Sequence, residues 1–247
     1  MKPTLWTLVP LVILFTCGSA QTVLDFEGVK DGNPVVTLQT GEIIEDQFLG
    51  DWGVAIESVK FDSGTGDFIV SPYPAVIFDT ANPTGGDTDL ATPGAGGTPP
   101  ALGNVLIVHE RKTSTSPVSN PDDKASGSTI RFTFQDPVII DQVGLLDLDD
   151  GSTSASLAGR ALDGSLIGSF SANPFDVAGA GDNSYQVVTL PWDSSVRMLD
   201  VDFSSSGAVA FVSWNVIPEP AEVGAASLLA LAGMLVLRKR SARRTKS

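Results

Sequence analysis

The chain has 247 residues and a formal net charge of −14 at neutral pH. The acids are concentrated in residues 21–217, which hold eight Lys or Arg residues against 27 Asp or Glu residues, a net charge of −19. Such a body repels nucleic acid and anionic membranes, so we expect neither as a partner. The single cysteine, Cys17, precedes the body, which therefore has no disulfide, no cysteine-based zinc site and no thiol nucleophile.

The first 20 residues have the layout of a secretory signal peptide. Lys2 supplies the positive start, residues 5–15 form an apolar run, and small residues at 18–20 precede a predicted cleavage site between Ala20 and Gln21. The apolar run is too short for a stable membrane span. We therefore predict export, with signal peptidase as the processing partner. A lipoprotein signal ending at the cysteine and a buried first helix are the alternatives.

Residues 21–217 contain short apolar runs separated by turns rich in Gly, Ser, Thr, Asp and Pro. Several runs alternate with period two: Ile130, Phe132 and Phe134 face one way, and Arg131 and Thr133 face the other. No stretch keeps a helical period over three turns. We predict an all-β ectodomain, an antiparallel β-sandwich of jelly-roll type. The predicted strands are 22–26, 35–38, 53–61, 68–70, 75–78, 104–109, 129–134, 138–148, 154–161, 166–170, 185–190, 199–203 and 208–215.

Two polar stretches interrupt this rhythm, at residues 82–100 and 112–128. Both are predicted loops, and long loops on a sandwich are often functional. Flexible insertions without a function are the alternative.

Aromatic side chains are the expected contacts for a sugar, because a ring can stack on the apolar face of a pyranose. The candidates for ligand binding are Trp52, Tyr73 and Trp192. Packing in the core is the alternative for Trp52, whereas Trp192 follows Pro191 in a predicted turn, where exposure is expected.

Clustered aspartates make calcium the expected metal, because Ca²⁺ accepts oxygen ligands in irregular geometry. Asp87 and Asp89 lie in the first predicted loop, and Asp147, Asp149 and Asp150 lie where a strand enters a Gly-Ser turn. Neither group has the ligand spacing of an EF-hand. Solvated turn residues without an ion are the alternative.

Catalytic motifs are sparse. The only histidine, His109, ends a predicted strand, and the sequence contains neither a Gly-x-Ser-x-Gly elbow nor a second histidine for a zinc site. We therefore predict a protein that is not an enzyme. The alternative is a polysaccharide hydrolase or lyase that uses paired carboxylates, which a sequence alone does not pair.

The last 30 residues contain a short motif, an apolar segment and a basic terminus. These are, in order, Pro218-Glu219-Pro220, the run from Val223 to Leu237, and the cluster that starts with Arg238, Lys239 and Arg240. A 15-residue helix rises about 22 Å against a hydrocarbon core of about 30 Å. It spans if the bilayer thins and the first basic side chains snorkel. The basic cluster then keeps the C-terminus cytoplasmic and the acidic body outside.

This three-part tail resembles the PEP-CTERM sorting signal of Gram-negative bacteria. The resemblance implies that an exosortase removes the tail near the motif. The protein would be anchored briefly in the inner membrane and then reach the cell surface or the extracellular matrix. We predict an exported structural or adhesive protein. The alternative is a carbohydrate-binding module, with or without calcium, that binds extracellular polysaccharide, and an uncleaved tail anchor is the alternative for the C-terminus.

Overall fold

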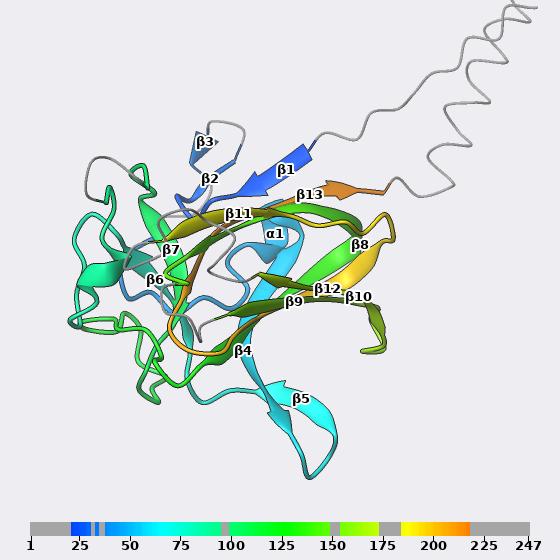
Figure 1. Ribbon diagram of the computed structural model, residues 1–247, viewed down its shortest axis with the longest axis horizontal. Helices are drawn as coiled ribbons and strands as arrows, with labels where there is room; N and C mark the ends of the chain where they lie inside the picture. Colours follow the sequence, from blue (N-terminus) through cyan, green and yellow to red (C-terminus); the bar gives the residue numbers. More distant parts are fainter. Residues whose placement is uncertain are drawn as a thin grey trace, which may run out of the picture.

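The computed structural model describes residues 21–30, 33–34, 38–94, 99–148, 154–172 and 184–217, which form mainly antiparallel strands (Figure 1). The predicted signal peptide and sorting tail lie outside these residues, so both stay predictions. Within the described ranges, no helix has the length and hydropathy that crossing a membrane would take. The expected membrane segment from Val223 to Leu237 belongs to the tail, which that finding does not cover.

Among the described residues, eleven strands form a continuous hydrogen-bonded sheet, and the strand β8 (Ser128–Leu146) folds it into two layers. The first half of β8 pairs with β4 (Val54–Asp62) and β12 (Val196–Phe203). Its second half pairs with β11 (Tyr185–Thr189) and β13 (Ala208–Val216). Residues 135–137 of β8 are paired with neither β4 nor β13. Pro137 has no N–H to donate to a neighbouring strand, so β8 passes from the first layer to the second at this point.

The first layer has the order β5–β4–β8–β12–β9–β10, and it adds the strands β5 (Asp67–Val70), β9 (Ala155–Arg160) and β10 (Leu166–Ala172). In the second layer, β13 pairs on its far side with β1 and β7, and β7 pairs with β6. These strands are β1 (Gln21–Leu24), β6 (Ala75–Asp79) and β7 (Asn104–Val108). Smaller elements are the two-stranded pair β2 (Val29–Lys30) and β3 (Asn33–Pro34), the helix α1 (Leu49–Trp52) and the 3₁₀ turn η1 (Thr88–Leu90).

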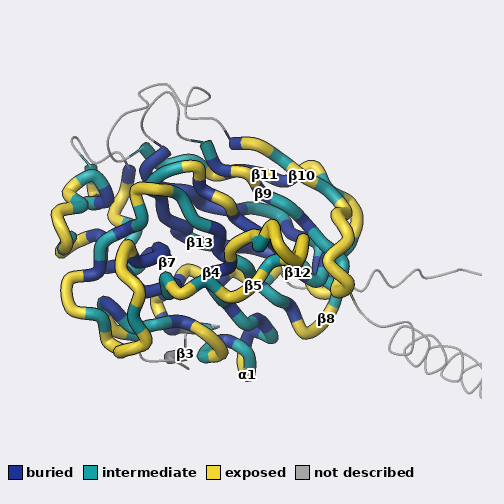
Figure 2. The backbone as a smooth tube through the Cα atoms, turned by 90° about the horizontal axis from the view of Figure 1, so that it is seen from below, coloured by how far each residue is buried: buried dark blue, intermediate teal, exposed yellow. Residues whose placement is uncertain are grey.

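The main core lies between the two layers, and every second side chain in the first half of β8 points into it. Ile130, Phe132 and Phe134 are at most 1% exposed, whereas Arg131 and Thr133 on the opposite face are half-buried. Burying one such side chain stabilises the fold by about 1.5–3 kcal/mol. Figure 2 shows the buried residues on the inner strands and the exposed ones on the turns. The prediction of an all-β antiparallel fold is therefore confirmed.

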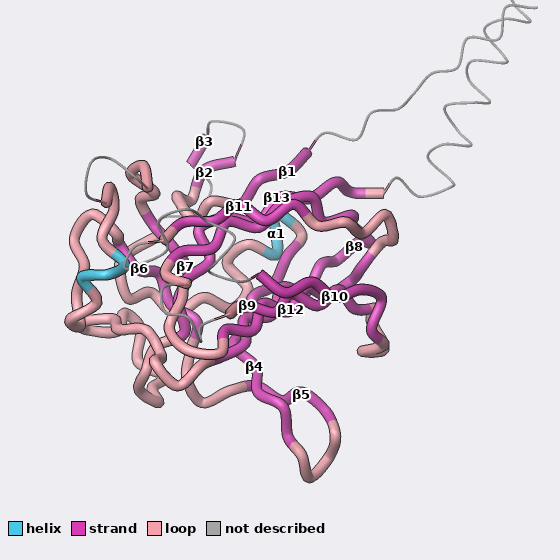
Figure 3. Tube along the Cα trace, in the orientation of Figure 1, coloured by secondary structure: helices cyan, strands magenta, loops and turns pink. Residues whose placement is uncertain are grey.

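A second apolar cluster covers the outer face of the second layer. Val76, Phe78 and Ile107 from β6 and β7 pack there with Leu90, which the loop at residues 80–94 contributes. This loop and the loop at residues 109–127 gather at the same end of the molecule (Figure 3). They are bonded to each other, since the Thr84 hydroxyl donates to the carbonyl oxygen of Pro121 at 2.8 Å. The two predicted loops thus form a packed layer of their own.

The predicted strands differ from the observed ones at two places, and the short elements β2, β3, α1 and η1 were not predicted. The predicted strands 129–134 and 138–148 are one strand, because β8 continues through its bend. Of the predicted strand 35–38, residues 35–37 lie outside the described residues and Leu38 is not in a strand. The helix α1 was not expected; it is a single turn that ends at Gly53, whose left-handed φ of 67° suits glycine.

Candidate functional site

Polar side chains follow the outer face of the first layer in rows across the strands. Arg131 of β8 lies opposite Asp200 of β12, and the next row pairs Thr129 with Asp202. Small residues of β9 continue both rows, with Ser156 opposite Asp202. The outer face of the first layer therefore carries charged side chains at its centre, on β8 and β12, and small side chains on β9.

Two arginines share one aspartate at the centre of this face. Arg131 donates from Nε to Asp200 Oδ1 at 2.7 Å and from Nη2 to Oδ2 at 3.0 Å. Arg160 of β9 donates from Nε to Asp200 Oδ2 at 2.7 Å. The Asp200 side chain is only 3% exposed, against 12% and 21% for Arg131 and Arg160. Guanidinium–carboxylate bonds at these distances fix all three groups in place.

The hairpin of β4 and β5 adds aromatic rings to the cluster. Phe68 lies over both guanidinium groups, with its ring centroid 4.7 Å from Cζ of Arg131 and 5.1 Å from Cζ of Arg160. Its cross-strand partner Phe61 meets it edge to face at 5.6 Å between centroids. Phe61 is 59% exposed. The hairpin projects from the body in Figure 1, so it presents a rigid, accessible ring beside fixed charges.

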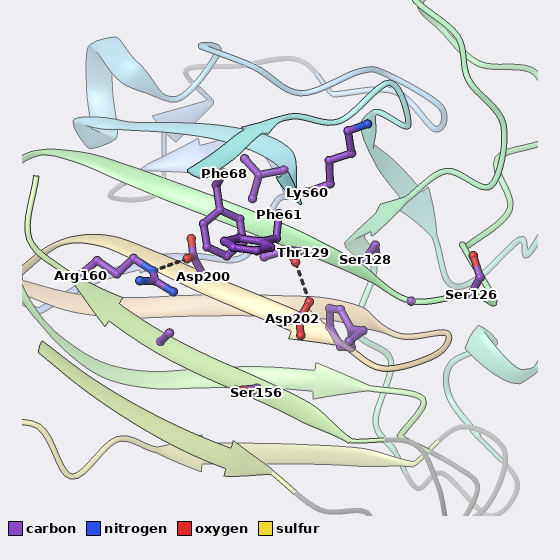
Figure 4. Close-up of a pocket in the computed structure, with 14 residues that line it drawn as sticks. Lys60, Phe61, Phe68, Ser126, Ser128, Thr129, Ser156, Arg160, Asp200 and Asp202 are labelled. Carbon is purple, nitrogen blue, oxygen red and sulfur yellow. Dashed lines mark hydrogen bonds and ion pairs between the residues drawn. The ribbon is translucent and has the colours of Figure 1, made fainter. Parts of the chain in front are cut away.

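Phe61, Phe68, Arg160 and Asp200 line a cavity of about 400 Å³, drawn in Figure 4, whereas Arg131 lines the cavity next to it. A second cavity of about 710 Å³ borders the same cluster and shares Phe61, Phe68 and Arg160 with the first. We call the two cavities together the hairpin groove. Residues that line it are Val59, Lys60, Phe61, Thr65, Gly66, Asp67, Phe68, Ile69, Ser126, Gly127, Ser128, Thr129, Arg131, Ser156, Ala158, Arg160, Leu162, Asp163, Gly164, Met198, Asp200, Asp202 and Phe203.

Asp202 is the second carboxylate of the groove, and its environment differs from that of Asp200. Burial raises the pKa of Asp202, and the nearby charge of Asp200 raises it further. The bond from the Thr129 hydroxyl, at 2.6 Å and visible in Figure 4, acts in the opposite direction. Asp202 is therefore the carboxylate of this face that takes up a proton more readily than an ordinary aspartate.

An acidic cluster lies where the two long loops meet. Carboxylate oxygens of Asp87, Asp122 and Asp123 come within 4.8 Å of one another. Asp87 accepts a bond from the backbone N–H of Asp123 at 2.8 Å, and Asp123 accepts one from the backbone N–H of Gly207 at 2.7 Å. Burial, with the charges of the other two aspartates, raises the pKa of Asp87 to about 8. Oxygen ligands of this kind suit Ca²⁺, so these three residues could hold one.

The predicted metal ligands are only partly brought together. Asp87 belongs to the acidic cluster, whereas Asp89 lies on η1 and accepts a bond from the N–H of Leu90. Asp147 is buried at the end of β8 with a left-handed φ of 66°, and Asp149 and Asp150 lie outside the described residues. Asp122 and Asp123 were not predicted. They form an acidic pair in the second predicted loop, but their approach to Asp87 depends on how the loops pack.

The predicted ligand-binding aromatics do not line the hairpin groove. Trp52 is 5% exposed and packs edge to face on Phe48, so the structure places it in the core, where its ring is not available for stacking. Tyr73 is half-buried, with the ammonium groups of Lys112 and Lys124 at 5.6 and 5.0 Å from its ring centroid.

The third predicted aromatic, Trp192, packs against the edge of the core. Its ring lies so close to Gly159 and Gly168 that a Cβ atom there would be 2.7 to 2.9 Å from atoms of Val196 or of the indole. Two of the rings that do line the groove, Phe61 and Phe68, belong to predicted strands. The signal that could have revealed them is the turn at residues 62–67, which makes these two positions cross-strand neighbours.

His109 follows β7 directly and is 3% exposed. Its Nδ1 lies 3.1 Å from the carbonyl oxygen of Asp122, so the ring is tied to the second loop. His109 is not among the residues that line the hairpin groove.

No protein-family model and no curated protein matches the chain. Among solved structures, a mutant of the lectin binding domain of Lectinolysin complexed with Lewis b matches with a TM-score of 0.29 and 9% identity, over 38% of this chain and 68% of that chain. A fucose binding module of Streptococcus pneumoniae matches with a TM-score of 0.26 and 6% identity, over 38% and 69%. The enzymatically active domain of tailspike protein 4 of Bacteriophage CBA120 matches with a TM-score of 0.29 and 14% identity, over 74% of this chain and 22% of that chain. Similarities of this size identify neither a family nor a ligand.

Proposed function

We propose that the body is a carbohydrate-binding module without catalytic activity, displayed outside the cell. The observation that carries this proposal is the hairpin groove, in which the exposed ring of Phe61 stands beside hydroxyl, carboxylate and guanidinium groups of the sheet.

The chemistry of a sugar matches this combination. A pyranose ring has an apolar face that stacks on an aromatic ring and a rim of hydroxyl groups that both donate and accept hydrogen bonds. Thr129, Ser156 and Asp202 offer such partners on the sheet, and Phe61 offers the ring. The ion cluster under Phe68 holds the surface rigid, so little conformational entropy is lost on binding.

Binding rather than hydrolysis is favoured by the state of the two carboxylates. A glycosidase needs two carboxyl groups that flank one glycosidic bond and exchange protons with it. Both oxygens of Asp200 already accept bonds from guanidinium groups, which leaves this residue poorly suited to act as a base or nucleophile. Release of reducing ends from a bound polysaccharide would contradict this part of the proposal.

Export completes the proposal and rests on the sequence signals. The signal peptide would bring the chain to signal peptidase, and the tail would bring it to an exosortase at the inner membrane. The adhesive role predicted from the sequence would then come from the groove, which would hold polysaccharide at the cell surface or in the matrix.

Replacing the exposed ring tests the proposal. We expect Phe61→Ala to weaken glycan binding about tenfold, because the ring gives the apolar stacking surface and little stability. The measurement is a glycan-array screen of the full chain, followed by titration of the best ligand. Val187→Ala is the matched control, since Val187 is 43% exposed on β11, away from the groove. A wild-type chain that binds no glycan, or a Phe61→Ala variant that binds like the wild type, would overturn the proposal.

A further inference from the structure

The ion cluster of the hairpin groove contains more positive than negative charge. Two guanidinium groups share the single carboxylate of Asp200, and within the described residues neither makes another ion pair. Lys60 also belongs to the lining of the groove, but its side chain points away from the ion cluster (Figure 4). Two of the eight basic residues of a strongly acidic body therefore meet at one carboxylate on this face.

Each arginine keeps hydrogen-bond donors for a ligand. Arg131 uses Nε and Nη2 on Asp200, and Arg160 uses Nε on Asp200 and Nη1 on the carbonyl oxygen of Gly164. In the described part of the chain no group accepts a bond from Nη1 of Arg131 or from Nη2 of Arg160. Both side chains line the groove, and Phe68 holds both guanidinium groups in place.

The other acids of the groove do not neutralise this cluster at contact distance. Asp202 accepts its bond from the Thr129 hydroxyl, and Asp163 accepts bonds from the N–H and hydroxyl of Ser165. Asp67 and Asp163 are exposed at the rim, where salt screens their charge. The partly buried guanidinium pair is screened much less.

We propose that the polysaccharide held by this groove is anionic, and that its carboxylate or sulfate groups bind the guanidinium groups of Arg131 and Arg160. This inference rests on the proposed function and names its ligand class. A guanidinium fork matches the geometry of a carboxylate or sulfate and binds it through charge-assisted hydrogen bonds. Elsewhere the acidic body repels an acidic polymer, which confines binding to the groove.

Ligands that differ only in charge provide the test. The full chain is titrated with polygalacturonate, with the same polymer after methyl esterification, with dextran sulfate and with neutral dextran. We expect wild-type protein to bind at least one anionic polymer about tenfold more tightly than its uncharged counterpart. Preferential binding of polygalacturonate would identify carboxylate as the bound group, and preferential binding of dextran sulfate would identify sulfate.

Matched arginine variants assign the effect to the groove. Arg160→Gln should fold, because it leaves Arg131 and Asp200 as a balanced pair, and it should lose about tenfold in affinity for the anionic polymer. Arg160→Lys keeps the positive charge but lacks the paired N–H donors of a guanidinium group, so its affinity should lie between those of the wild type and Arg160→Gln. Arg111→Gln removes the same charge from a side chain that is 78% exposed in another loop, and it should bind like the wild type.

The outcomes separate this inference from the proposed function. If the wild type binds both charged polymers no more tightly than their uncharged counterparts, the anionic ligand is overturned, while a loss caused by Phe61→Ala keeps the carbohydrate-binding module. Binding of no glycan overturns both. If Arg160→Gln melts below the assay temperature, the comparison of each charged polymer with its uncharged counterpart decides alone.

Discussion

Asp87 is the residue whose protonation the fold changes most clearly. Burial between two loops, next to Asp122 and Asp123, raises its pKa from 3.8 to about 8. The folded chain therefore holds a proton that the unfolded chain releases as the pH rises through 4. The favourable contribution of this group is complete below pH 4 and is lost as the pH rises to 8.

We therefore expect Asp87→Asn to raise the melting temperature at pH 8 by several degrees in the presence of a chelator, and to leave it unchanged at pH 4. The asparagine cannot ionise, so the penalty of burying a charge disappears. Scanning calorimetry of both proteins across this pH range measures the effect. Asp89→Asn, in the same loop but outside the acidic cluster, is the control and should change nothing. A wild-type stability that rises between pH 4 and pH 8 in this comparison would contradict the assignment.

A bound Ca²⁺ would make the negative charge of Asp87 favourable to folding at pH 8. Adding calcium therefore tests the metal prediction with the wild type and Asp87→Asn. An ion bound only by the folded state stabilises it by about 2.7 kcal/mol at a hundred times its dissociation constant. Added Ca²⁺ should then raise the melting temperature of the wild type at pH 8 and leave Asp87→Asn largely unaffected. Equal responses of the two proteins would show that the acidic cluster is not a calcium site.

The β4–β5 hairpin and the start of β8 frame the groove, and each depends on a glycine with a left-handed backbone. Gly66 in the hairpin turn and Gly127 before β8 share a φ of 78°. A Cβ atom at Gly66 would meet nothing within 4 Å, whereas one at Gly127 would lie 2.6 Å from the carbonyl oxygen of Phe203. A side chain would therefore meet the same backbone strain at both positions, but only Gly66 has room for a Cβ atom.

We expect Gly66→Ala to cost about 1 kcal/mol of stability, which is the strain of the backbone alone. Gly127→Ala should cost about 2 kcal/mol more, because the end of β12 must move away from β8. Denaturant unfolding of both variants gives the difference. If both variants lose the same amount of stability, the turn before β8 can shift to make room for the methyl group without displacing the end of β12.

At the level of single elements, the sequence predicted what local periodicity controls. The alternation of Ile130, Phe132 and Phe134 identified the inner face of β8, and it equally placed Arg131 on the outer face. It could not show that Asp200, 69 positions later, would lie opposite Arg131, because cross-strand pairing depends on sheet order. The acidic cluster was missed for the same reason, since Asp87 meets Asp122 only through the packing of two loops.

The whole molecule combines an acidic body with a groove in which two arginines meet at one carboxylate. The charge pattern of the sequence predicted a body that repels nucleic acid, but it gave no position for the few basic residues. Folding brings two of them, Arg131 and Arg160, to one face, beside the exposed ring of Phe61. The affinity of the molecule for an acidic polymer would thus arise from the fold and not from its net charge.

The sorting prediction belongs to this scale, because it concerns how the body is joined to its tail. The last strand, β13, ends at Val216, and the N–H of Ile217 still donates to the carbonyl oxygen of Pro137 at 3.2 Å. The Pro-Glu-Pro motif therefore follows the folded body directly. Its prolines lack an N–H and disfavour helix, so they would keep this stretch extended and accessible to an exosortase.

Replacing Pro218 and Pro220 together by alanine should let the apolar helix that the sequence predicts extend into the motif, since alanine is the strongest helix former. We expect the precursor with its tail to accumulate in the membrane fraction, at the expense of the shorter mature form. Mass spectrometry of the protein from cells and medium measures both forms and fixes both termini. Pro191→Ala, an exposed proline in a turn of the body, is the control and should be processed normally. If the double variant matures like the wild type, the motif does not direct removal of the tail, and the groove would then work on a protein that reaches its polysaccharide by another route.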